Sequence, residues 1–280
     1  MPVNQEKIQK DKAEIEQKSF GTTQDEDLGL YCEIFSAKTD IEGQDGGVVS
    51  KLLVKGFKQE LFDTAIVVRR RDGYCAEAVI AENPIDVLAA KGTRYLKVNV
   101  TKKLRELISQ GKKRIVIVCT PCEAKASRII QQSLKNDCEI TIIGLFCFEA
   151  FNRAKLKDEI KARFNVDLDK VEKIQVKYGK FGMHFDGKEV SCKVKDLGVA
   201  AEGACRFCDD FTAQQADISV GSVGSKKGYS TVIIRTKAGE KLLKNLDWSK
   251  EPVDKEEISR LTKFKRSRAK KSLEEVNNPK

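Results

Sequence analysis

The chain lacks long hydrophobic runs. None of its apolar stretches approaches the roughly 18 residues that a helix needs to cross a bilayer. Its first residues, MPVNQEKIQKDKAEIEQK, contain no apolar segment of the kind found in secretion signals. We therefore expect a cytoplasmic protein without a membrane span.

Histidine is nearly absent, and one common cofactor motif is missing. The single histidine, His184, gives little support to a catalytic cysteine–histidine pair, and we assign it no role. The glycine fingerprint GxGxxG, which holds dinucleotides in many dehydrogenases, does not occur. These two gaps disfavour a thiol-based hydrolase and an enzyme that binds a nicotinamide cofactor in the usual way.

The overall composition is that of a folded protein with a basic surface. With 280 residues, 40% of them hydrophobic and 34% charged, the chain can bury one sizeable core and is neither disordered nor fibrous. The 52 lysines and arginines exceed the 42 acidic residues and give a net charge of +10. This excess favours an anionic partner such as a nucleic acid, an anionic surface or a phosphorylated cofactor.

Hydrophobic periodicity predicts an α/β fold of the mixed α+β kind, with a mixed β-sheet core flanked by helices and a hairpin-rich insert. Residues 115–119, 121–134 and 139–146 read as an apolar strand, an amphipathic helix and a second apolar strand, a unit typical of a parallel sheet. The insert is expected to turn at Asp186-Gly187. We divide the chain into a polar N-terminal extension (1–27), a central domain (28–247) and a basic C-terminal tail (248–280), for which a solvated helix is favoured.

Nine cysteines without a secretion signal suggest thiolate chemistry more than disulfides. Cys122 and Cys147 follow the two apolar strands, so their side chains are expected at the same edge of the sheet. Cys205-Arg-Phe-Cys208 adds a pair whose spacing lets one turn present both thiolates to a metal centre. Cys122, Cys147, Cys205 and Cys208 are therefore our candidate metal ligands.

An iron–sulfur cluster suits these four positions better than zinc does. Their spacing is not that of two paired CxxC knuckles, which structural zinc sites commonly use. For Cys32, Cys75, Cys138 and Cys192 we favour a structural role as small buried side chains. Cys119 is ambiguous because it lies three residues before Cys122.

Three glycine-containing loops are candidates for holding an anionic cofactor, because glycine lets backbone amides approach phosphate closely. Each loop alone is a weak signal, since a turn glycine needs no ligand to explain it. The candidate residues are Gln44, Asp45, Gly46 and Gly47; Gly92, Thr93 and Arg94; and Gly221, Ser222, Val223, Gly224 and Ser225.

Taken in order, six segments between about residues 28 and 245 resemble the coenzyme F420 hydrogenase/dehydrogenase beta-subunit family. They are Gln44-Asp45-Gly46-Gly47, Gly92-Thr93-Arg94-Tyr95, Pro121-Cys122, Gly144-Leu145-Phe146-Cys147-Phe148-Glu149, Gly203-Ala204-Cys205-Arg206-Phe207-Cys208 and Asp217-Ile218-Ser219-Val220-Gly221-Ser222-Val223-Gly224-Ser225. The resemblance implies a subunit that binds FAD and one 4Fe-4S cluster and exchanges a hydride with coenzyme F420. It places the cluster on the four candidate cysteines and FAD on the glycine loops.

The resemblance also implies partner redox subunits, themselves iron–sulfur proteins, of hydrogenase, formate dehydrogenase or heterodisulfide reductase type. Because residues 1–27 contain no cysteine, electrons are expected to leave through such a partner. Coenzyme F420 is anionic, so Arg94, Lys226, Lys227 and the Arg69–Arg71 cluster are candidates for attracting it.

Two alternatives remain open at this point. One is a flavin and iron–sulfur electron carrier that does not use F420. The other is a zinc-stabilised nucleic-acid-binding protein, suggested by the CxxC pair and by six basic residues in the nine from Lys263 to Lys271. We favour the oxidoreductase subunit and expect no nucleic acid.

Overall fold

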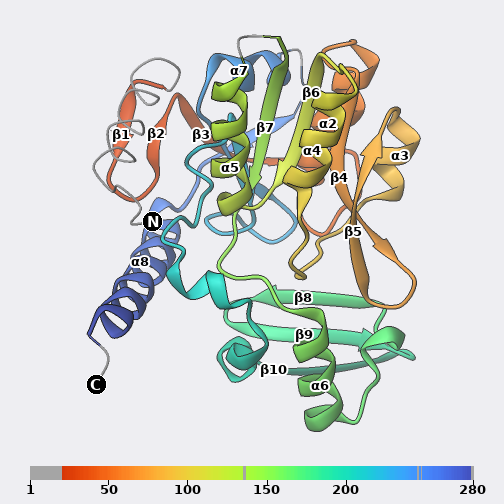
Figure 1. Cartoon of the computed structure of the whole chain (residues 1–280), viewed down its shortest axis with the longest axis vertical. Helices are drawn as coiled ribbons and strands as arrows, with labels where there is room; N and C mark the ends of the chain where they lie inside the picture. Colours follow the sequence, from red (N-terminus) through yellow and green to blue (C-terminus); the bar gives the residue numbers. More distant parts are fainter. Residues whose placement is uncertain (1–20, 135–136, 245, 247, 279–280) are drawn as a thin grey trace.

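A large mixed sheet forms the centre of the protein (Figure 1). The structure is a computed structural model, and it describes residues 21–134, 137–244, 246 and 248–278. The sheet has eight strands in the order β13-β3-β12-β11-β7-β6-β4-β5. These strands are β3 (Glu33–Lys38), β4 (Thr64–Arg71), β5 (Cys75–Ala81), β6 (Arg114–Cys119), β7 (Glu139–Leu145), β11 (Ile218–Gly221), β12 (Ser230–Ile234) and β13 (Ser249–Glu251).

The middle of the sheet is parallel. Strands β4, β6, β7 and β11 are parallel neighbours, which confirms the unit predicted for residues 115–146. Strand β3 has the same direction as β11, because both pair antiparallel with β12. The loops that follow β3, β4, β6, β7 and β11 consequently leave from one edge of the sheet, which we call the carboxyl edge. In α/β sheets this is the edge where ligands bind.

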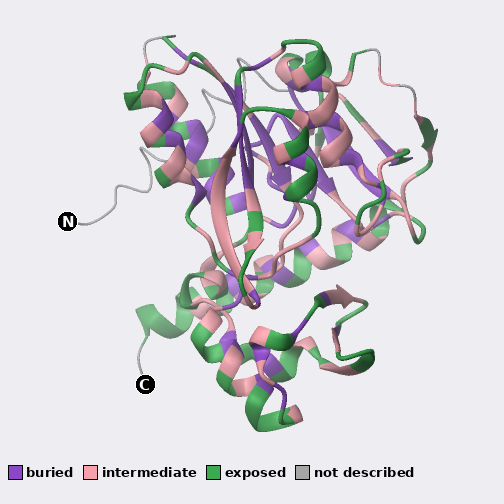
Figure 2. Ribbon diagram, turned by 90° about the vertical axis from the view of Figure 1, so that its right-hand side faces the viewer, coloured by how far each residue is buried: buried purple, intermediate pink, exposed green. Residues whose placement is uncertain are grey.

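Helices cover both faces of the sheet, as the alternation of its apolar residues requires. Val116 and Val118 of β6 belong to the core beneath α2, whereas Ile115 and Ile117 belong to the core beneath α4. Figure 2 shows the resulting buried strands between more exposed helices. The helices are α2 (Val48–Lys58), α3 (Pro84–Ala89) and α7 (Lys237–Leu243) on one face, with α4 (Val100–Ser109) and α5 (Pro121–Ser133) on the other.

The hairpin-rich insert forms a separate small layer below the large sheet in Figure 1. Its strands β8 (Lys173–Lys177), β9 (Lys180–Phe185) and β10 (Lys188–Lys193) pair antiparallel in the order β10-β9-β8, and α6 (Arg153–Phe164) covers them. The turn at Asp186-Gly187 is present, with both residues at positive φ. The predicted mixed sheet and insert are thus confirmed.

The two ends of the chain contribute structure of their own. Of the N-terminal extension, residues 1–20 lie outside the described residues, while β1 (Thr23–Asp25) pairs with β2 (Gly29–Tyr31). The C-terminal segment adds β13 to the sheet and then forms the long helix α8 (Lys255–Asn277). Lys265 and Ala269 of α8 are buried, so this helix differs from the solvated helix favoured for the tail. In the part of the chain that the structure describes, no helix is long and apolar enough to cross a membrane.

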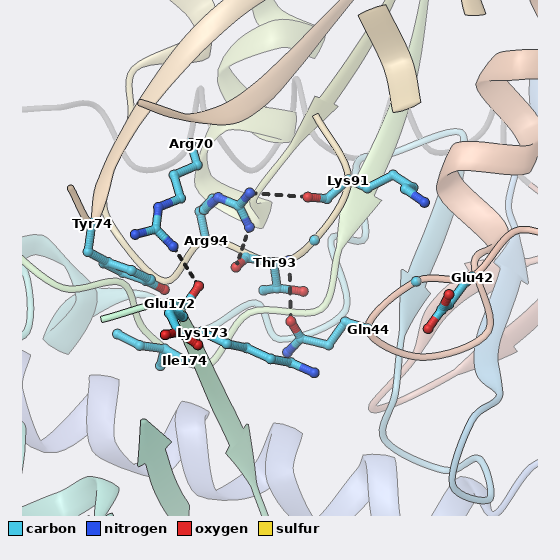
Figure 3. A pocket seen from close by; sticks show the side chains of 12 residues that line it. Glu42, Gln44, Arg70, Tyr74, Lys91, Thr93, Arg94, Glu172, Lys173 and Ile174 are labelled. Carbon is cyan, nitrogen blue, oxygen red and sulfur yellow. Dashed lines mark hydrogen bonds between the residues drawn. The ribbon is translucent and has the colours of Figure 1, made fainter. Parts of the chain in front are cut away.

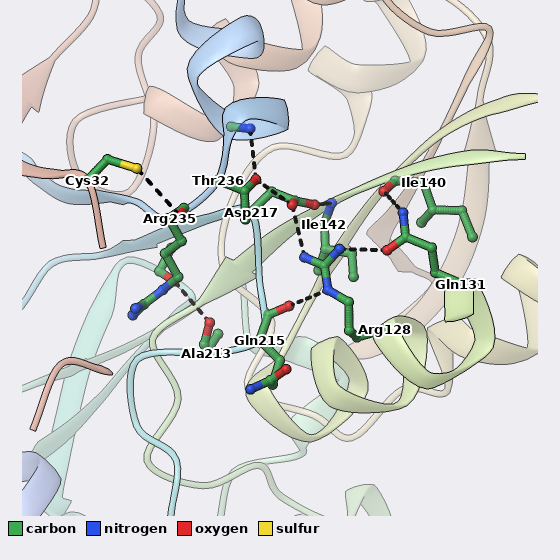
Figure 4. Close-up of polar contacts among 12 residues, drawn as sticks. Cys32, Arg128, Gln131, Ile140, Ile142, Ala213, Gln215, Asp217, Arg235 and Thr236 are labelled. Carbon is green, nitrogen blue, oxygen red and sulfur yellow. Dashed lines mark hydrogen bonds and ion pairs between the residues drawn. The ribbon is translucent and has the colours of Figure 1, made fainter. Parts of the chain in front are cut away.

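Buried charged side chains hold the sheet to the segment that follows Cys208 (Figure 4). Asp217, at the start of β11, accepts bonds from the Arg128 guanidinium at 2.9 Å, the Thr236 hydroxyl at 2.6 Å and the Ile142 amide at 2.7 Å. Arg235, which is fully buried, donates to the Ser219 hydroxyl and to backbone carbonyls of residues 28, 30 and 212. These bonds satisfy polar groups that would otherwise be costly to bury.

Candidate functional site

The four candidate cysteines come from three segments near the carboxyl edge. Cys122 is the second residue of α5, directly after β6, and Cys147 lies two residues beyond β7. Cys205 sits in the 3-10 helix η3 (Gly203–Phe207), and Cys208 follows that helix. Cys122 is exposed to solvent, whereas the other three cysteines are partly buried. The predicted positions of Cys122 and Cys147 at the sheet edge agree with the structure.

The thiols influence one another electrostatically, which places them close together. Burial raises the pKa of the Cys147 thiol to about 12, an effect that the nearby Lys265 ammonium opposes. The other three candidate thiols add to this rise. The pKa of Cys205 is likewise raised, first by burial and then, more weakly, by Cys122 and Cys208. As free thiols, Cys147 and Cys205 therefore resist ionisation in this neighbourhood.

Hydrogen-bond donors lie beside two of the four sulfur atoms. The Ala150 amide donates to Cys205 Sγ at 3.4 Å. Lys97 Nζ lies 3.8 Å from Cys122 Sγ and forms a 3.1 Å ion pair with Glu123. Donors of this kind stabilise sulfur atoms that carry negative charge, so they suit thiolates that bind a metal centre.

The four thiols are of the donor type that an iron–sulfur cluster uses. Within residues 21–134, 137–244, 246 and 248–278, no three histidine, cysteine or carboxylate side chains are gathered tightly enough to hold one metal ion. A four-iron cluster is larger than an ion, and its thiolate ligands stand correspondingly further apart. Four neighbouring thiols with amide and ammonium donors are the ligand type that such clusters require.

The other five cysteines lie elsewhere. Cys119 and Cys138 are buried, whereas Cys32, Cys75 and Cys192 are partly exposed. Cys119 belongs to the apolar core beneath α4, so its side chain is packed inside the protein despite its closeness in sequence to Cys122.

A cavity of about 320 Å³ opens near the same edge (Figure 3). Two of the three glycine loops line it. Gln44, from the loop after β3, accepts a bond from the Thr93 amide at 3.3 Å and donates to the Tyr95 hydroxyl at 2.9 Å. Gly92, Thr93 and Arg94 supply the opposite wall. The structure therefore brings together two segments that the sequence placed some fifty residues apart.

The cavity wall carries positive charge that lacks a matching carboxylate. Arg70 and Arg94 both line it, and among the described residues no carboxylate oxygen lies within 4 Å of either guanidinium. Arg70 instead donates to three backbone carbonyls, of residues 73, 171 and 172, and Arg94 donates to those of residues 91 and 93. Burial lowers the pKa of Arg94, and the charge of Arg70 adds to that effect. Lys91 and Lys173 also line the cavity, against the two acidic residues Glu42 and Glu172. The cavity is suited to an anionic ligand.

Two polar atoms in this wall lack protein partners. The hydroxyl of Tyr74 and Nε of Arg94 are buried, and neither has a hydrogen-bond partner in the described part of the chain. Tyr74 is 2% exposed, and the Arg70 guanidinium lies 5.7 Å from its ring centroid. Buried polar atoms are normally satisfied, and a ligand in the cavity would offer partners to these two.

The cavity and the thiols are joined by one short segment. Thr93 and Arg94 line the cavity, and Lys97, three residues beyond Arg94, reaches Cys122. An extended chain of three residues spans about 10 Å. Within this segment Leu96 forms an isolated β-bridge with Phe151. Phe151 directly follows Ala150, whose amide donates to Cys205 Sγ. A ligand in the cavity would therefore lie near the four cysteine thiols.

The third glycine loop lies at the same edge but does not line the cavity. Gly224 has a φ of +84°, and its amide donates to the Glu257 carboxylate of α8 at 2.9 Å. The first loop approaches it, because the Gly46 amide donates to the Ser230 hydroxyl at 3.0 Å. A side chain at Gly46 or at Gly47 would collide with backbone, so chain packing explains these two glycines without a ligand.

The basic residues expected to attract an anion separate into two groups. Arg94 and Arg70 line the cavity. By contrast, Arg69 pairs with Glu77 at 2.9 Å, and Lys226 pairs with Glu251 at 2.6 Å, away from the cavity lining. Sequence reasoning missed Tyr74, Lys97 and Lys173, because a single tyrosine or lysine carries no motif.

Comparisons with known proteins identify the family. The profile described as "Coenzyme F420 hydrogenase/dehydrogenase, beta subunit N-term" matches residues 34–105, and its C-terminal counterpart matches residues 112–259. Together the two profiles cover most of the chain.

Named relatives are similar over most of this chain. The Coenzyme F420-dependent sulfite reductase of Methanocaldococcus jannaschii is 35% identical over 261 residues, which are 88% of this chain and 41% of that protein. One subunit of the F(420)H(2) dehydrogenase of Methanosarcina mazei is 36% identical over 73% of this chain and 59% of its own length. The chain thus spans about half the length of these two relatives. The Coenzyme F420 hydrogenase subunit beta of Methanococcus voltae is 33% identical over 76% of this chain and 80% of its own.

A solved structure shares the fold. A chain of the F420-reducing [NiFe] hydrogenase complex from Methanosarcina barkeri superposes with a TM-score of 0.84 at 28% identity, covering 91% of this chain and 95% of that chain. This chain belongs to the coenzyme F420 hydrogenase/dehydrogenase beta-subunit family.

Proposed function

We propose that this chain is an oxidoreductase subunit that transfers hydride or electrons between coenzyme F420 and a partner redox subunit, using FAD and one 4Fe-4S cluster. The observation that carries the proposal is the gathering of four thiols beside a cationic cavity at one sheet edge. Cys122, Cys147, Cys205 and Cys208 would hold the cluster. The cytoplasm and a soluble multi-subunit complex are the proposed setting.

When bound, a flavin and a cluster together convert a hydride into single electrons, so the protein needs little acid–base chemistry of its own. The residues of this chain bind and orient. The Gln44 side chain links the two loops of the cavity, and the Ala150 amide and Lys97 ammonium donate toward the sulfur atoms. Cys122, the exposed thiol, marks the side on which a partner would approach the cluster.

The cavity would receive the anionic part of a coenzyme. Arg70 and Arg94 face it without a carboxylate within 4 Å in the described part of the chain, and the Tyr74 hydroxyl there lacks a partner. Phosphate and carboxylate groups are the natural ligands of such a set. The third glycine loop, Gly221–Ser225, remains a proposed part of the FAD site at the same edge.

The first test is an anaerobic absorption spectrum of the purified chain, followed by addition of reduced F420. We expect a flavin band with a broad iron–sulfur shoulder, and bleaching with recovery of oxidised F420. A flavin and cluster spectrum that ignores F420 would favour an electron carrier with another donor. A colourless zinc protein would overturn the proposal and favour a nucleic-acid-binding role.

Single cysteine variants test the ligand assignment. We expect Cys205→Ser or Cys208→Ser to lose the cluster, with iron falling from about four atoms per chain to near zero, because a hydroxyl is a poor substitute for a thiolate. Cys75→Ser, on β5, is the matched control and should keep its iron. Iron measured on anaerobically purified protein decides the matter, and unchanged iron in the first two variants would refute the assignment.

A further inference from the structure

Two cations of α8 reach the segments that carry three of the four cysteines. Lys265 is 1% exposed, and its ammonium donates to the Cys147 carbonyl at 2.5 Å and to the Asp210 carbonyl at 2.6 Å. One turn further along α8, Arg268 donates to the Phe148 carbonyl at 3.1 Å and to the Cys205 carbonyl at 3.0 Å. Arg268 also pairs with Glu149 at 2.8 Å.

The pattern of acceptors is the same for both side chains. Each takes one carbonyl from the loop after β7, at Cys147 or Phe148, and one from the segment around Cys205 and Cys208. Those two segments are some sixty residues apart in sequence. Two donors spaced three residues apart on one rigid helix therefore fix the position of Cys147 relative to the Cys205–Cys208 pair.

Burial of the Lys265 ammonium is unfavourable unless a nearby negative charge compensates for the lost hydration. Among the described residues no carboxylate oxygen lies within 4 Å of its ammonium, although it is close enough to Cys147 to affect that thiol. A buried ammonium without a counterion is strongly unfavourable. The Asp210 carboxyl, which is close enough for Lys265 to influence its pKa, offsets part of this cost, and four thiolates around a cluster would add further negative charge.

We propose that Lys265 and Arg268 are positioning residues that clamp the two cysteine-bearing segments together and place positive charge beside the cluster. The clamp lies beyond residue 259, where the match to the family profile ends. The mechanical part of this proposal stands on the contacts of the chain alone, and the electrostatic part rests on the proposed cluster.

Hydrogen exchange of the metal-free chain tests the mechanical part. In Arg268→Gln we expect the amides of residues 147–150 and 203–208 to exchange about tenfold faster, because loss of charge-assisted bonds releases both segments. Lys271→Gln, an exposed lysine on the same helix, is the control and should exchange like the wild type. Lys265→Met should act like Arg268→Gln, and if it fails to fold, the quarter-exposed Arg268 still carries the test.

The iron-loaded chain tests the electrostatic part. Lys265→Met should lower the midpoint potential of the cluster and speed the release of iron to a chelator about tenfold. Arg268→Lys keeps the positive charge but loses the planar set of guanidinium donors, so it should release iron faster at a nearly unchanged potential. Wild-type exchange rates in both Lys265→Met and Arg268→Gln would overturn the clamp. A wild-type chain that binds no iron would overturn the proposed function while leaving the exchange result valid.

Discussion

Two buried cations, Arg235 and Lys265, and the partly buried Arg94 form no ion pair within 4 Å among the described residues. Arg235 is fully buried and is held by a hydroxyl and by backbone carbonyls, and its pKa falls to about 10 because of burial. Lys265 is held by two carbonyls, and Arg94 has a buried Nε without a partner in the described chain. Arg235 is fully satisfied by the protein and therefore has a structural role. The incomplete satisfaction of Arg94 instead indicates a ligand.

Tyr74→Phe separates these two roles at the cavity. Burial raises the pKa of Tyr74, so its hydroxyl stays a donor at neutral pH. Because this hydroxyl has no protein partner among the described residues, removing it should leave the melting temperature unchanged or slightly higher. Binding of the anionic coenzyme should weaken about fivefold to thirtyfold, as expected for one lost hydrogen bond to a charged group.

Fluorescence titrations with FAD and with F420 would show which of the two coenzymes loses affinity in Tyr74→Phe. Phenylalanine keeps the aromatic ring beneath Arg70, so the variant removes the hydroxyl without changing the packing of the ring. Unchanged affinity for both coenzymes, together with a lower melting temperature, would mean that the hydroxyl has a structural role.

At the scale of elements, the site depends on contacts between segments that are distant in sequence. Strand β7 ends beside β11, and a side chain at Gly144 would collide with Ala213 and Ala216, so only glycine lets the segment after Cys208 approach this strand closely. Helix α6 anchors the insert through Asp169, which accepts bonds from Arg153 and Lys157. Because the insert supplies Lys173 and Ile174 to the cavity, its anchoring affects the site.

The Asp169 anchor predicts an acid-sensitive contribution to stability. The hydrogen bond from Lys157, followed by that from Arg153, holds the pKa of Asp169 below its usual value. A lowered folded-state pKa stabilises the protein above the ordinary aspartate pKa of about 3.9, and this contribution is lost as the pH falls through the folded value. Asp169→Asn should therefore melt about 2–4 °C below the wild type at pH 7.

The difference in melting temperature between the two proteins should narrow as the pH falls below about 3.9. Thermal melts followed by circular dichroism from pH 7 to pH 3 would measure it. Asp158→Asn makes the same charge change at an exposed position of α6 and should show a smaller gap at every pH. If the difference in melting temperature between Asp169→Asn and the wild type did not change with pH, the stabilising role of the Asp169 carboxylate would be contradicted.

For the whole molecule, net charge and the cavity act in the same direction. The chain carries +10, and the described cavity wall contains two arginines and two lysines against two acidic residues. A field of this sign raises the encounter rate of an anionic coenzyme, and salt screens it. Long-range attraction and local binding would thus favour the same class of ligand.

We expect the rate constant for reaction with reduced F420 to fall about tenfold between 20 mM and 500 mM sodium chloride. Stopped-flow absorbance of the flavin would measure it. Photochemical reduction of the same flavin by a neutral deazaflavin is the control and should depend little on salt. A salt-independent F420 reaction would show that attraction by the basic surface is unimportant.

Much of the fold was predictable from sequence because it depends on local patterns. Apolar runs such as residues 115–119 and 139–146 identify buried strands, and the directions of parallel strands place Cys122 and Cys147 at one edge. The pairing of the first two glycine loops around a cavity was not predictable, since the Gln44–Thr93 contact depends on how distant segments pack. Tyr74 and Lys173 gave no signal for the same reason.

The sequence by itself determined the family, the strand–helix order and the candidate ligands, because these are written in periodicity and in ordered motifs. Only the tertiary structure decided the role of α8. A run of basic residues looks alike whether it is solvated or buried, and the difference lies in two carbonyl-lined positions that form when the loop after β7 meets the segment around Cys205. Long-range packing brings those carbonyl acceptors together, so no local sequence pattern could predict them.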